Sequence, residues 1–337
     1  MKETFSNFGL TVEQTEVLFS LQRMLIVADL RNERKKKPLF GDNKAETKQR
    51  WLNKWDTSII TFLAKLGGSF KISDCEYSSI RNKVAEIDKN AQNTVWKYMI
   101  FLECVLYTAY YPLDTDKDAY KPFKGLKMDK AAKKEELNII AEMLNIDNKY
   151  IKIFEDAYSS AIKKLSGYWT KVAMGAGIGI IVILIAIVTF QYEIIAFFAA
   201  EGLSGAAAIS AGLAALGGGA VAAGGFGMAG GVAVLIGGGT LLGASAGTAA
   251  GFSIASLGAN AVLSEAAKLQ VVLKEIVLAI QKDTKYFQEL LIKINQQIHN
   301  LREENIKLNR DIESNKKKIK NLEESIKILE KLIKINC

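Results

Sequence analysis

The chain has 337 residues and a formal net charge of +8, and its 3 cysteines and single histidine exclude several classes of site. One histidine cannot build a multi-histidine zinc centre, and three widely spaced cysteines favour reduced thiols over a disulfide framework. The charges are unevenly distributed: Gly202–Ser264 is a run of 63 residues without a single charge, and it holds 18 of the 27 glycines. A uniformly soluble enzyme is not expected from this distribution.

Residues 1–165 predict a helical domain, to which we assign a sensor or regulatory role. Thr11 and Gln14 form a capping box ahead of apolar residues at helical spacing, and that pattern breaks at the charged run 31–38. No alternation of period two indicates strands. Further helices are predicted at about 45–66, 73–89, 93–111, 129–144 and 147–165.

Residues 166–264 predict a transmembrane region. Val172–Phe190 is a run of 19 uncharged residues. As a helix it would be about 28 Å long, close to the roughly 30 Å hydrocarbon thickness of a bilayer. Basic and aromatic residues before the run are typical of an interfacial anchor: Lys164, Trp169 and Lys171. The alternative is a buried helix of a soluble domain.

Glycines spaced by four follow in this region and predict close helix packing within a membrane. Two or four spans fit the length, and either number places both termini on the same side. The lysines on both flanks make that side cytoplasmic. A flexible linker is the alternative, but interleaved Val, Leu, Ile and Phe argue against it. The candidate membrane-packing residues are Gly227, Gly231, Gly239, Gly243, Gly247 and Gly251.

Residues 265–337 predict a long helix that ends in a coiled coil, and its heptads extend from Phe287 to Ile333. Isoleucine at position a with leucine at d favours a parallel two-stranded coil, and Asn305 at a would fix its register. Because 265–286 contain neither Gly nor Pro, we expect no break in the helix. The alternative is an antiparallel coil within one chain, packed on the N-terminal domain. The other register residues considered are Ile312, Ile319 and Ile326.

A basic cluster is the one candidate site for an anionic ligand, with a solvated loop as the alternative. It consists of Arg34, Lys35, Lys36 and Lys37. No catalytic constellation, metal-ligand spacing or phosphate-binding glycine motif is present in a suitable context. The sequence therefore predicts a protein that is not an enzyme and uses no cofactor or metal.

The glycine-rich run at 211–239 follows a Lys/Trp-flanked apolar helix and precedes a helix and coiled coil. In this order of segments, roughly 150–290 resembles bacterial glycine-rich transmembrane effectors of phage-defence systems, such as the Hailong-type membrane effector. The resemblance implies a channel-like toxic effector that is kept closed until infection, with a nucleotidyltransferase as its partner.

Together these features predict an all-α protein: an N-terminal helical domain, glycine-rich transmembrane helices and a long C-terminal coiled-coil helix. The predicted function is an oligomeric effector that forms a regulated ion channel or pore in the bacterial inner membrane, with both termini cytoplasmic, and arrests growth in anti-phage defence. Expected partners are the lipid bilayer, further copies of the chain, and a nucleotidyltransferase or an anionic nucleotide or oligonucleotide. Two alternatives stay open: an α-helical pore-forming toxin that is first soluble, and a non-conducting membrane anchor or scaffold.

Overall fold

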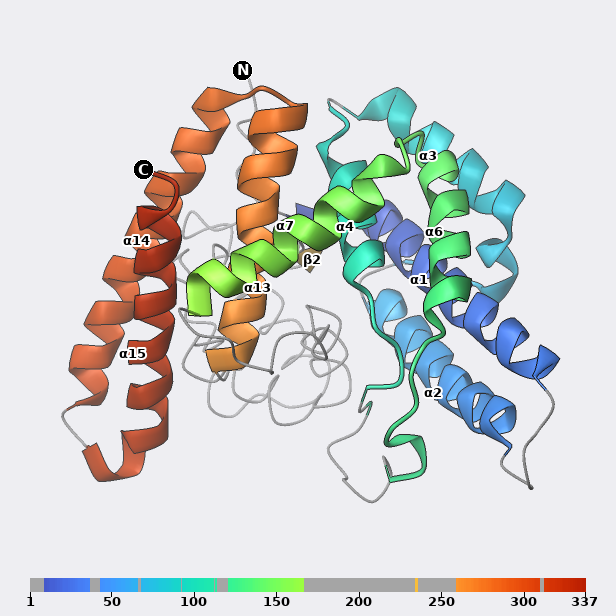
Figure 1. Cartoon of the computed structure of the whole chain (residues 1–337), viewed down its shortest axis with the longest axis horizontal. Coiled ribbons are helices and arrows are strands. Elements are labelled where there is room, and N and C mark those ends of the chain that lie inside the picture. The colour runs from blue at the N-terminus through green and yellow to red at the C-terminus, as the bar shows by residue number, and fades with distance from the viewer. Residues whose placement is uncertain are drawn as a thin grey trace. The chain divides into compact units, whose positions relative to one another are not determined.

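The computed structural model confirms the all-α class and divides into two compact units (Figure 1). One unit spans Leu10–Ile153, and the other includes Phe154 onward through the C-terminal helices. The strands among the described residues, β1 (Gly9–Leu10) and β2 (Val234–Leu235), are two residues long and form no layer. The structure describes residues 9–36, 43–65, 68–91, 93–111, 113, 121–166, 234–235, 259–309 and 312–337.

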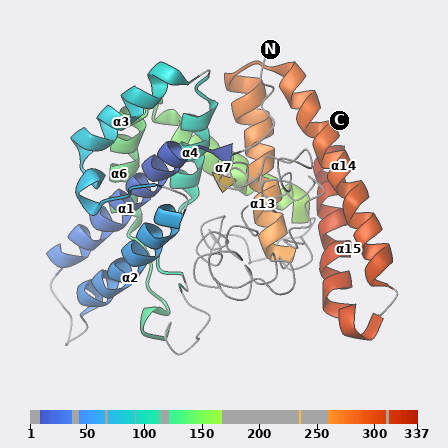
Figure 2. The ribbon, with the colours of Figure 1, turned by 180° about the vertical axis from the view of Figure 1, so that it is seen from behind.

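The N-terminal unit is built around α1 (Val12–Lys35), which contacts α2, α3, α4 and α6 (Figures 1 and 2). The predicted capping box begins α1: the Thr11 amide donates to the Gln14 side chain at 3.0 Å, and the Gln14 amide donates to the Thr11 hydroxyl at 3.3 Å. The other elements are α2 (Lys44–Lys65), the 3₁₀ turn η1 (Ile72–Cys75), α3 (Tyr77–Asn90), α4 (Val95–Leu106), the 3₁₀ turn η2 (Lys121–Phe123) and α6 (Lys130–Met143).

Helix ends differ from the sequence expectations at three places. The charged run does not stop α1 at Arg31, because lysine and arginine are compatible with a last helical turn, and α1 continues to Lys35. A 3₁₀ turn occupies the expected start of α3. The fourth helix ends at Leu106, well before Pro112, and Tyr110 then has a φ of 68°, the left-handed region that side chains rarely adopt.

A buried ion pair joins the segments of this unit. The Lys48 ammonium on α2 lies 2.8 Å from the Asp29 carboxylate on α1, and their side chains are only 2% and 0% exposed. Asp29 also accepts hydrogen bonds from the Tyr110 hydroxyl and, at 2.6 Å, from the Asp129 amide that precedes α6. One carboxylate therefore holds α2, the chain after α4 and the start of α6 against α1, and this explains how the strained Tyr110 backbone is retained.

Tyrosines of this unit provide a test of its packing by pH. Burial raises the pKa of Tyr77 to about 12, with a hydrogen bond to Glu136 as the second cause, and burial also raises the pKa of Tyr98, Tyr107, Tyr110 and Tyr111. Because the folded state holds these protons more tightly, stability is expected to fall as the pH rises above about 10, the unfolded value. In an absorbance titration, these five phenolates should appear at higher pH in the native protein than in denaturant. Coinciding curves would contradict the burial.

The described part of the C-terminal unit contains four α-helices and a π-helix, and the first of these, α7, begins five residues before the unit, which starts at Phe154. Its elements are α7 (Lys149–Ser166), α13 (Ala259–Val271), the π-helix η5 (Val272–Ile280), α14 (Thr284–Leu308) and α15 (Ile312–Lys334). The predicted unbroken helix from about 263 is wrong. Lys282 has a φ of 55°, and the Asp283 side chain accepts from the Tyr286 amide at 2.8 Å to begin a new helix. Neither Gly nor Pro is needed for this break, because an aspartate cap and one left-handed residue suffice.

The heptad repeat is divided between two helices of the same chain, which pack against each other. Helix α14 ends at Leu308, α15 begins at Ile312, and the two lie side by side (Figures 1 and 2). Because only three residues separate them, the two helices are antiparallel, and Arg302 of α14 pairs with Glu330 of α15 at 2.5 Å. The uninterrupted parallel coil is therefore wrong: each half of the repeat covers the other half. Positions a and d are buried as predicted at Phe287, Leu291, Ile294, Ile298, Leu301, Ile319, Leu322, Ile326 and Leu329.

Truncating the core of this hairpin tests that it is intramolecular. Leu322 is 0% exposed, so Leu322→Ala should lower the free energy of unfolding by about 2–5 kcal/mol. The unfolding midpoint of wild type and variant should stay constant when the protein concentration changes by about a hundredfold. Ile292→Ala is the control, because Ile292 is 57% exposed and should cost little. A midpoint that rises with concentration would show that the leucine packs between chains.

The prediction of an inner-membrane channel with both termini cytoplasmic is wrong for the described structure. No helix in the described ranges combines the length and apolar composition needed to cross a bilayer. Part of the predicted transmembrane region, from residue 259 to 264, instead begins α13, which continues through Glu265 and Lys268. Charged residues at these positions are costly at the centre of a bilayer. The predicted spans Val172–Phe190 and the six glycines of the small-residue ladder lie outside the described residues.

Candidate functional site

Two helices of the C-terminal unit flank the apolar segment, which we define as residues 167–258. Helix α7 leads into it and α13 follows it. The hydroxyls of Tyr158 on α7 and Ser264 on α13 are 2.8 Å apart and share a hydrogen bond. Because this contact lies within a few helical turns of Ser166 and of Ala259, the end of α7 and the start of α13 lie near each other.

Helix α7 is amphipathic. Ile151, Phe154, Ala161, Ile162 and Leu165 are buried at helical spacing, whereas lysines and acids occupy the opposite face. Lys164, one of the predicted interface residues, is exposed in the last turn. The other two, Trp169 and Lys171, lie outside the described residues.

Helix α13 is buried at every position from Val262 to Val271. This includes Glu265 and Lys268, whose side chains are 1% and 2% exposed and whose charged atoms are 3.3 Å apart. A paired arrangement is required, because an isolated charge at such depth would cost several kcal/mol, as an order of magnitude. The pair is i,i+3 on one helix, so it remains paired if α13 moves as a unit.

The C-terminus of the chain holds α13 through a pair of side-chain amides. The Gln270 amide donates to Asn336 at 3.2 Å, and the Asn336 amide donates back to Gln270 at 2.5 Å. Asn336 also donates to the Leu332 carbonyl at 2.7 Å, which anchors it to the end of α15. Helix α13 packs along α15. The end of the hairpin thus fastens the helix that follows the apolar segment.

The π-helix η5 continues α13 without interruption, and sequence reasoning missed it. Val272, Leu273, Ile276 and Val277 are buried, and the Lys274 ammonium lies 5.7 Å from the centre of the Phe287 ring. π-Helices are rare, and they are frequently found at functional sites. No residue type marks a π-helix, because the widened turn follows from packing and not from local propensity.

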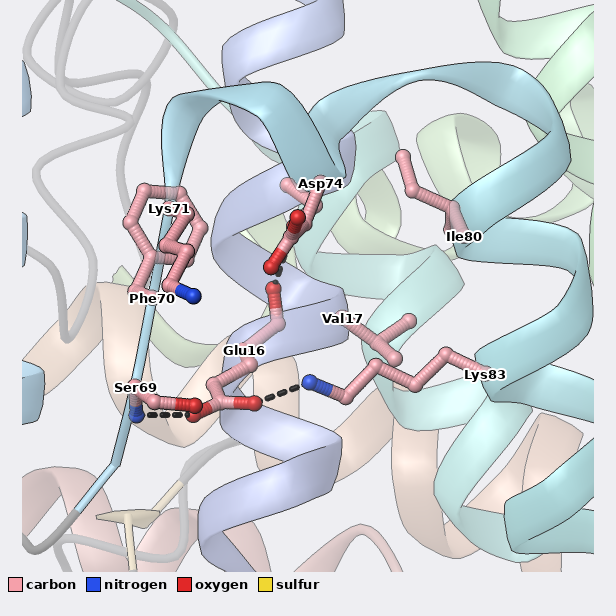
Figure 3. A pocket seen from close by; sticks show the side chains of 9 residues that line it. Glu16, Val17, Ser69, Phe70, Lys71, Asp74, Ile80 and Lys83 are labelled. Atoms are coloured by element: carbon pink, nitrogen blue, oxygen red, sulfur yellow. Dashed lines mark hydrogen bonds and ion pairs between the residues drawn. The ribbon is translucent and has the colours of Figure 1, made fainter.

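A small pocket in the N-terminal unit surrounds Glu16, as Figure 3 shows. The carboxylate pairs with the Lys83 ammonium and accepts from the Ser69 amide at 2.8 Å. A Cβ at Gly68 would lie 2.7 Å from the same carboxylate, so a larger residue there would displace Glu16 from its partners. Since Glu16 is 6% exposed and already bonded on both sides, it fastens the chain after α2 to α1. Among the described residues, no three His, Cys, Asp or Glu side chains are grouped for metal binding.

The predicted basic cluster is partly occupied by contacts within the protein. Arg34 donates to the Gln49 side chain at 2.8 Å, and Lys36 lies 3.2 Å from the Asp129 carboxylate. The hydrogen bond to Asp129 raises the pKa of Lys36. Lys35 is exposed, and Lys37 lies outside the described residues. Binding of an anionic ligand here stays a prediction.

The four register residues of the predicted coil have different surroundings. Ile319 and Ile326 are buried, at 8% and 9% exposure. The Asn305 side chain accepts from Asn309 at 3.4 Å, next to the end of α14. The side chain of Ile312 is outside the described part. The buried heptad positions already have partners within the chain, so they give no support for contacts between copies. Assembly of several copies stays a prediction.

Comparison with protein-family models, curated protein sequences and solved structures gives no match. The resemblance to phage-defence effectors and the nucleotidyltransferase partner stay predictions, and so does the absence of enzymatic activity. Arguments about function therefore depend on the geometry of α7, α13 and the hairpin.

The amide pair provides a direct test of how α13 is held. Gln270→Ala should lower the free energy of unfolding by about 1–3 kcal/mol, because it leaves the Asn336 amide without its partner. Hydrogen exchange of the α13 amides should accelerate at the same time. Gln296→Ala is the matched control: Gln296 is exposed on α14 and should change stability by less than about 0.5 kcal/mol. Equal exchange in both variants would show that the pair does not hold α13.

Proposed function

We propose that the protein is an α-helical pore-forming toxin, which stores the apolar segment between α7 and α13 and inserts it into a target membrane. The observation that carries this proposal is the Tyr158–Ser264 hydrogen bond, because it holds both ends of a largely uncharged segment together. A segment whose ends adjoin can enter and leave a membrane from one side without separating the helices that flank it. The two or four spans expected from its length have this property.

The distribution of charge defines the limits of the inserting part. Its charge-free run ends at Ser264, and the buried Glu265–Lys268 pair follows at once. Charged residues resist transfer into hydrocarbon, so insertion would stop at this pair. Within the segment, glycines at intervals of four allow helices to approach closely once they are inserted.

Helix α13 is the element at which insertion of the apolar segment would be controlled. It follows the segment directly, it is buried on every side from Val262 to Val271, and the Gln270–Asn336 pair fastens it to α15. Movement of the segment into a membrane would pull on α13 first. Regulation by a nucleotidyltransferase or by an anionic nucleotide would have to act on this contact, directly or through the N-terminal unit.

The test is leakage of a dye from lipid vesicles by the full-length protein. Ile181→Asp places a charge in the middle of the uncharged run Val172–Phe190. Since aspartate costs about 3 kcal/mol at the centre of a membrane helix, leakage should fall by at least about tenfold. Ile292→Asp is the control, because this residue is 57% exposed on α14 and lies outside the segment.

The results separate the possible functions. Leakage by wild type and by Ile292→Asp, but not by Ile181→Asp, supports the toxin. Vesicles that stay intact both with wild-type protein and with Gln270→Ala, the variant in which α13 is loosened, contradict the toxin and favour a non-conducting scaffold. Equal leakage by both aspartate variants would show that another part of the chain disturbs the membrane.

A further inference from the structure

The net charge of the C-terminal hairpin is concentrated at one end. Residues 307–320, where α14 ends and α15 begins, carry six Lys or Arg and two acids, a net charge of +4. The flanking parts 281–306 and 321–337 are each neutral, with four basic and four acidic residues in the first and three of each in the second. The hairpin is therefore a long rod with one strongly positive end.

Five exposed lysines form this end, and we call them the tip lysines. Lys307 is in the last turn of α14, and the others are in the first turns of α15: Lys316, Lys317, Lys318 and Lys320. Because the two helices are antiparallel, these turns lie at the same end of the pair (Figure 1). Within the described ranges no ion pair involves a tip lysine, whereas Arg302 and Lys285, away from the tip, pair with glutamates.

An exposed isoleucine lies beside these charges. Ile306 precedes Lys307 and is 67% exposed, which is more than any other large hydrophobic residue in the described part of the chain. Most large apolar residues of the hairpin outside the tip are buried, as Leu322 and Leu329 show, and Ile292, at 57%, is less exposed than Ile306. The tip thus combines unpaired positive charge with apolar surface.

We infer that the hairpin tip is a docking surface for a lipid membrane that exposes anionic headgroups. This inference rests on the proposed function, because the membrane that the tip binds would be the one that receives the apolar segment. Lysines attract anionic headgroups, and an isoleucine at the same place gains by entering the boundary between headgroups and acyl chains. A nucleic acid fits less well: it would give Ile306 no apolar partner, and residues 301–320 contain no aromatic side chain on which a base can stack.

The experiment measures co-sedimentation of the full-length protein with vesicles of neutral phosphatidylcholine, alone or mixed with anionic phosphatidylglycerol. Binding should require the anionic lipid and should weaken as the salt concentration rises. Each lysine near an anionic surface contributes about fivefold in affinity, so the triple variant Lys316→Glu, Lys317→Glu, Lys318→Glu should bind more weakly by at least about a hundredfold. Thermal unfolding followed by circular dichroism checks that the variant is folded.

Two matched controls separate the effect of the tip lysines from that of total net charge, and the effect of Ile306 from that of any exposed apolar residue. Lys124→Glu, Lys127→Glu, Lys134→Glu makes the same change in net charge at exposed positions of the N-terminal unit and should leave binding nearly unchanged. Ile306→Ser should weaken binding severalfold, and Ile292→Ser should not. Equal loss in both charge variants would overturn the inference, since total charge would then explain binding. Equal binding to neutral and anionic vesicles would overturn it as well.

Other outcomes separate this inference from the proposed function. Anionic binding that depends on the tip, but without dye leakage, would support the docking surface and contradict the toxin. Leakage that is the same in wild type and in the tip variant would contradict the docking surface alone. Binding of a fluorescent oligonucleotide that needs the tip lysines, with no binding to vesicles, would replace the membrane by a nucleic acid.

Discussion

The complete burial of α13 is the constraint on which the C-terminal unit depends. A helix exposed on one side needs a single apolar stripe, but α13 has no exposed face from Val262 to Val271 and must find a partner for every side chain. Its polar residues are satisfied accordingly: Glu265 and Lys268 pair with each other, Gln270 pairs with Asn336, and Ser264 bonds to Tyr158. The pair of Glu265 and Lys268 lies within α13, whereas the contacts of Ser264 and Gln270 reach two different neighbours, so α13 couples α7 to the hairpin.

The hairpin shows why a heptad pattern does not determine its own partner. Periodicity correctly identified nine buried a and d positions, because these positions are buried in any coil, but it also predicted burial of Leu308 and Ile333, which are partly exposed. The partner is decided by whether the helix continues or reverses, and here it ends at Leu308 and resumes at Ile312. No Gly or Pro marks the reversal, and Asn309 ends α14 with an ordinary helical cap geometry. A reversal inside the repeat lets the chain bury its own apolar stripes, at a smaller entropic cost than association of two chains.

The same distinction between local and non-local signals applies to the N-terminal unit. The capping box at Thr11 was predictable, because both hydrogen bonds are formed by residues three apart. The role of Lys48 was not, because its partner Asp29 is on another helix and Tyr110 arrives from a third segment. A lysine in a charged stretch normally indicates a solvated surface, and only tertiary packing shows that this one is buried. For the candidate site, composition located the apolar segment, but the contacts that hold its ends could not be read from the sequence.

The two surfaces of the C-terminal unit have different physical tasks, and this imposes an order on them. Exposure of the apolar segment to water would cost about 25 cal/mol for each Å² of apolar surface, so it cannot move far before a membrane is beside it. The tip lysines, in contrast, act through water across about 10 Å at ordinary salt and need no rearrangement of the helices. Under the proposed function, docking of the hairpin tip would therefore come first and would bring the acceptor membrane to the unit that contains α13. Release of α13 from Asn336 would then be favourable only where the membrane is present. In such a scheme the neutral flanks of the hairpin matter as much as its positive tip, because they confine attraction to one end of the rod.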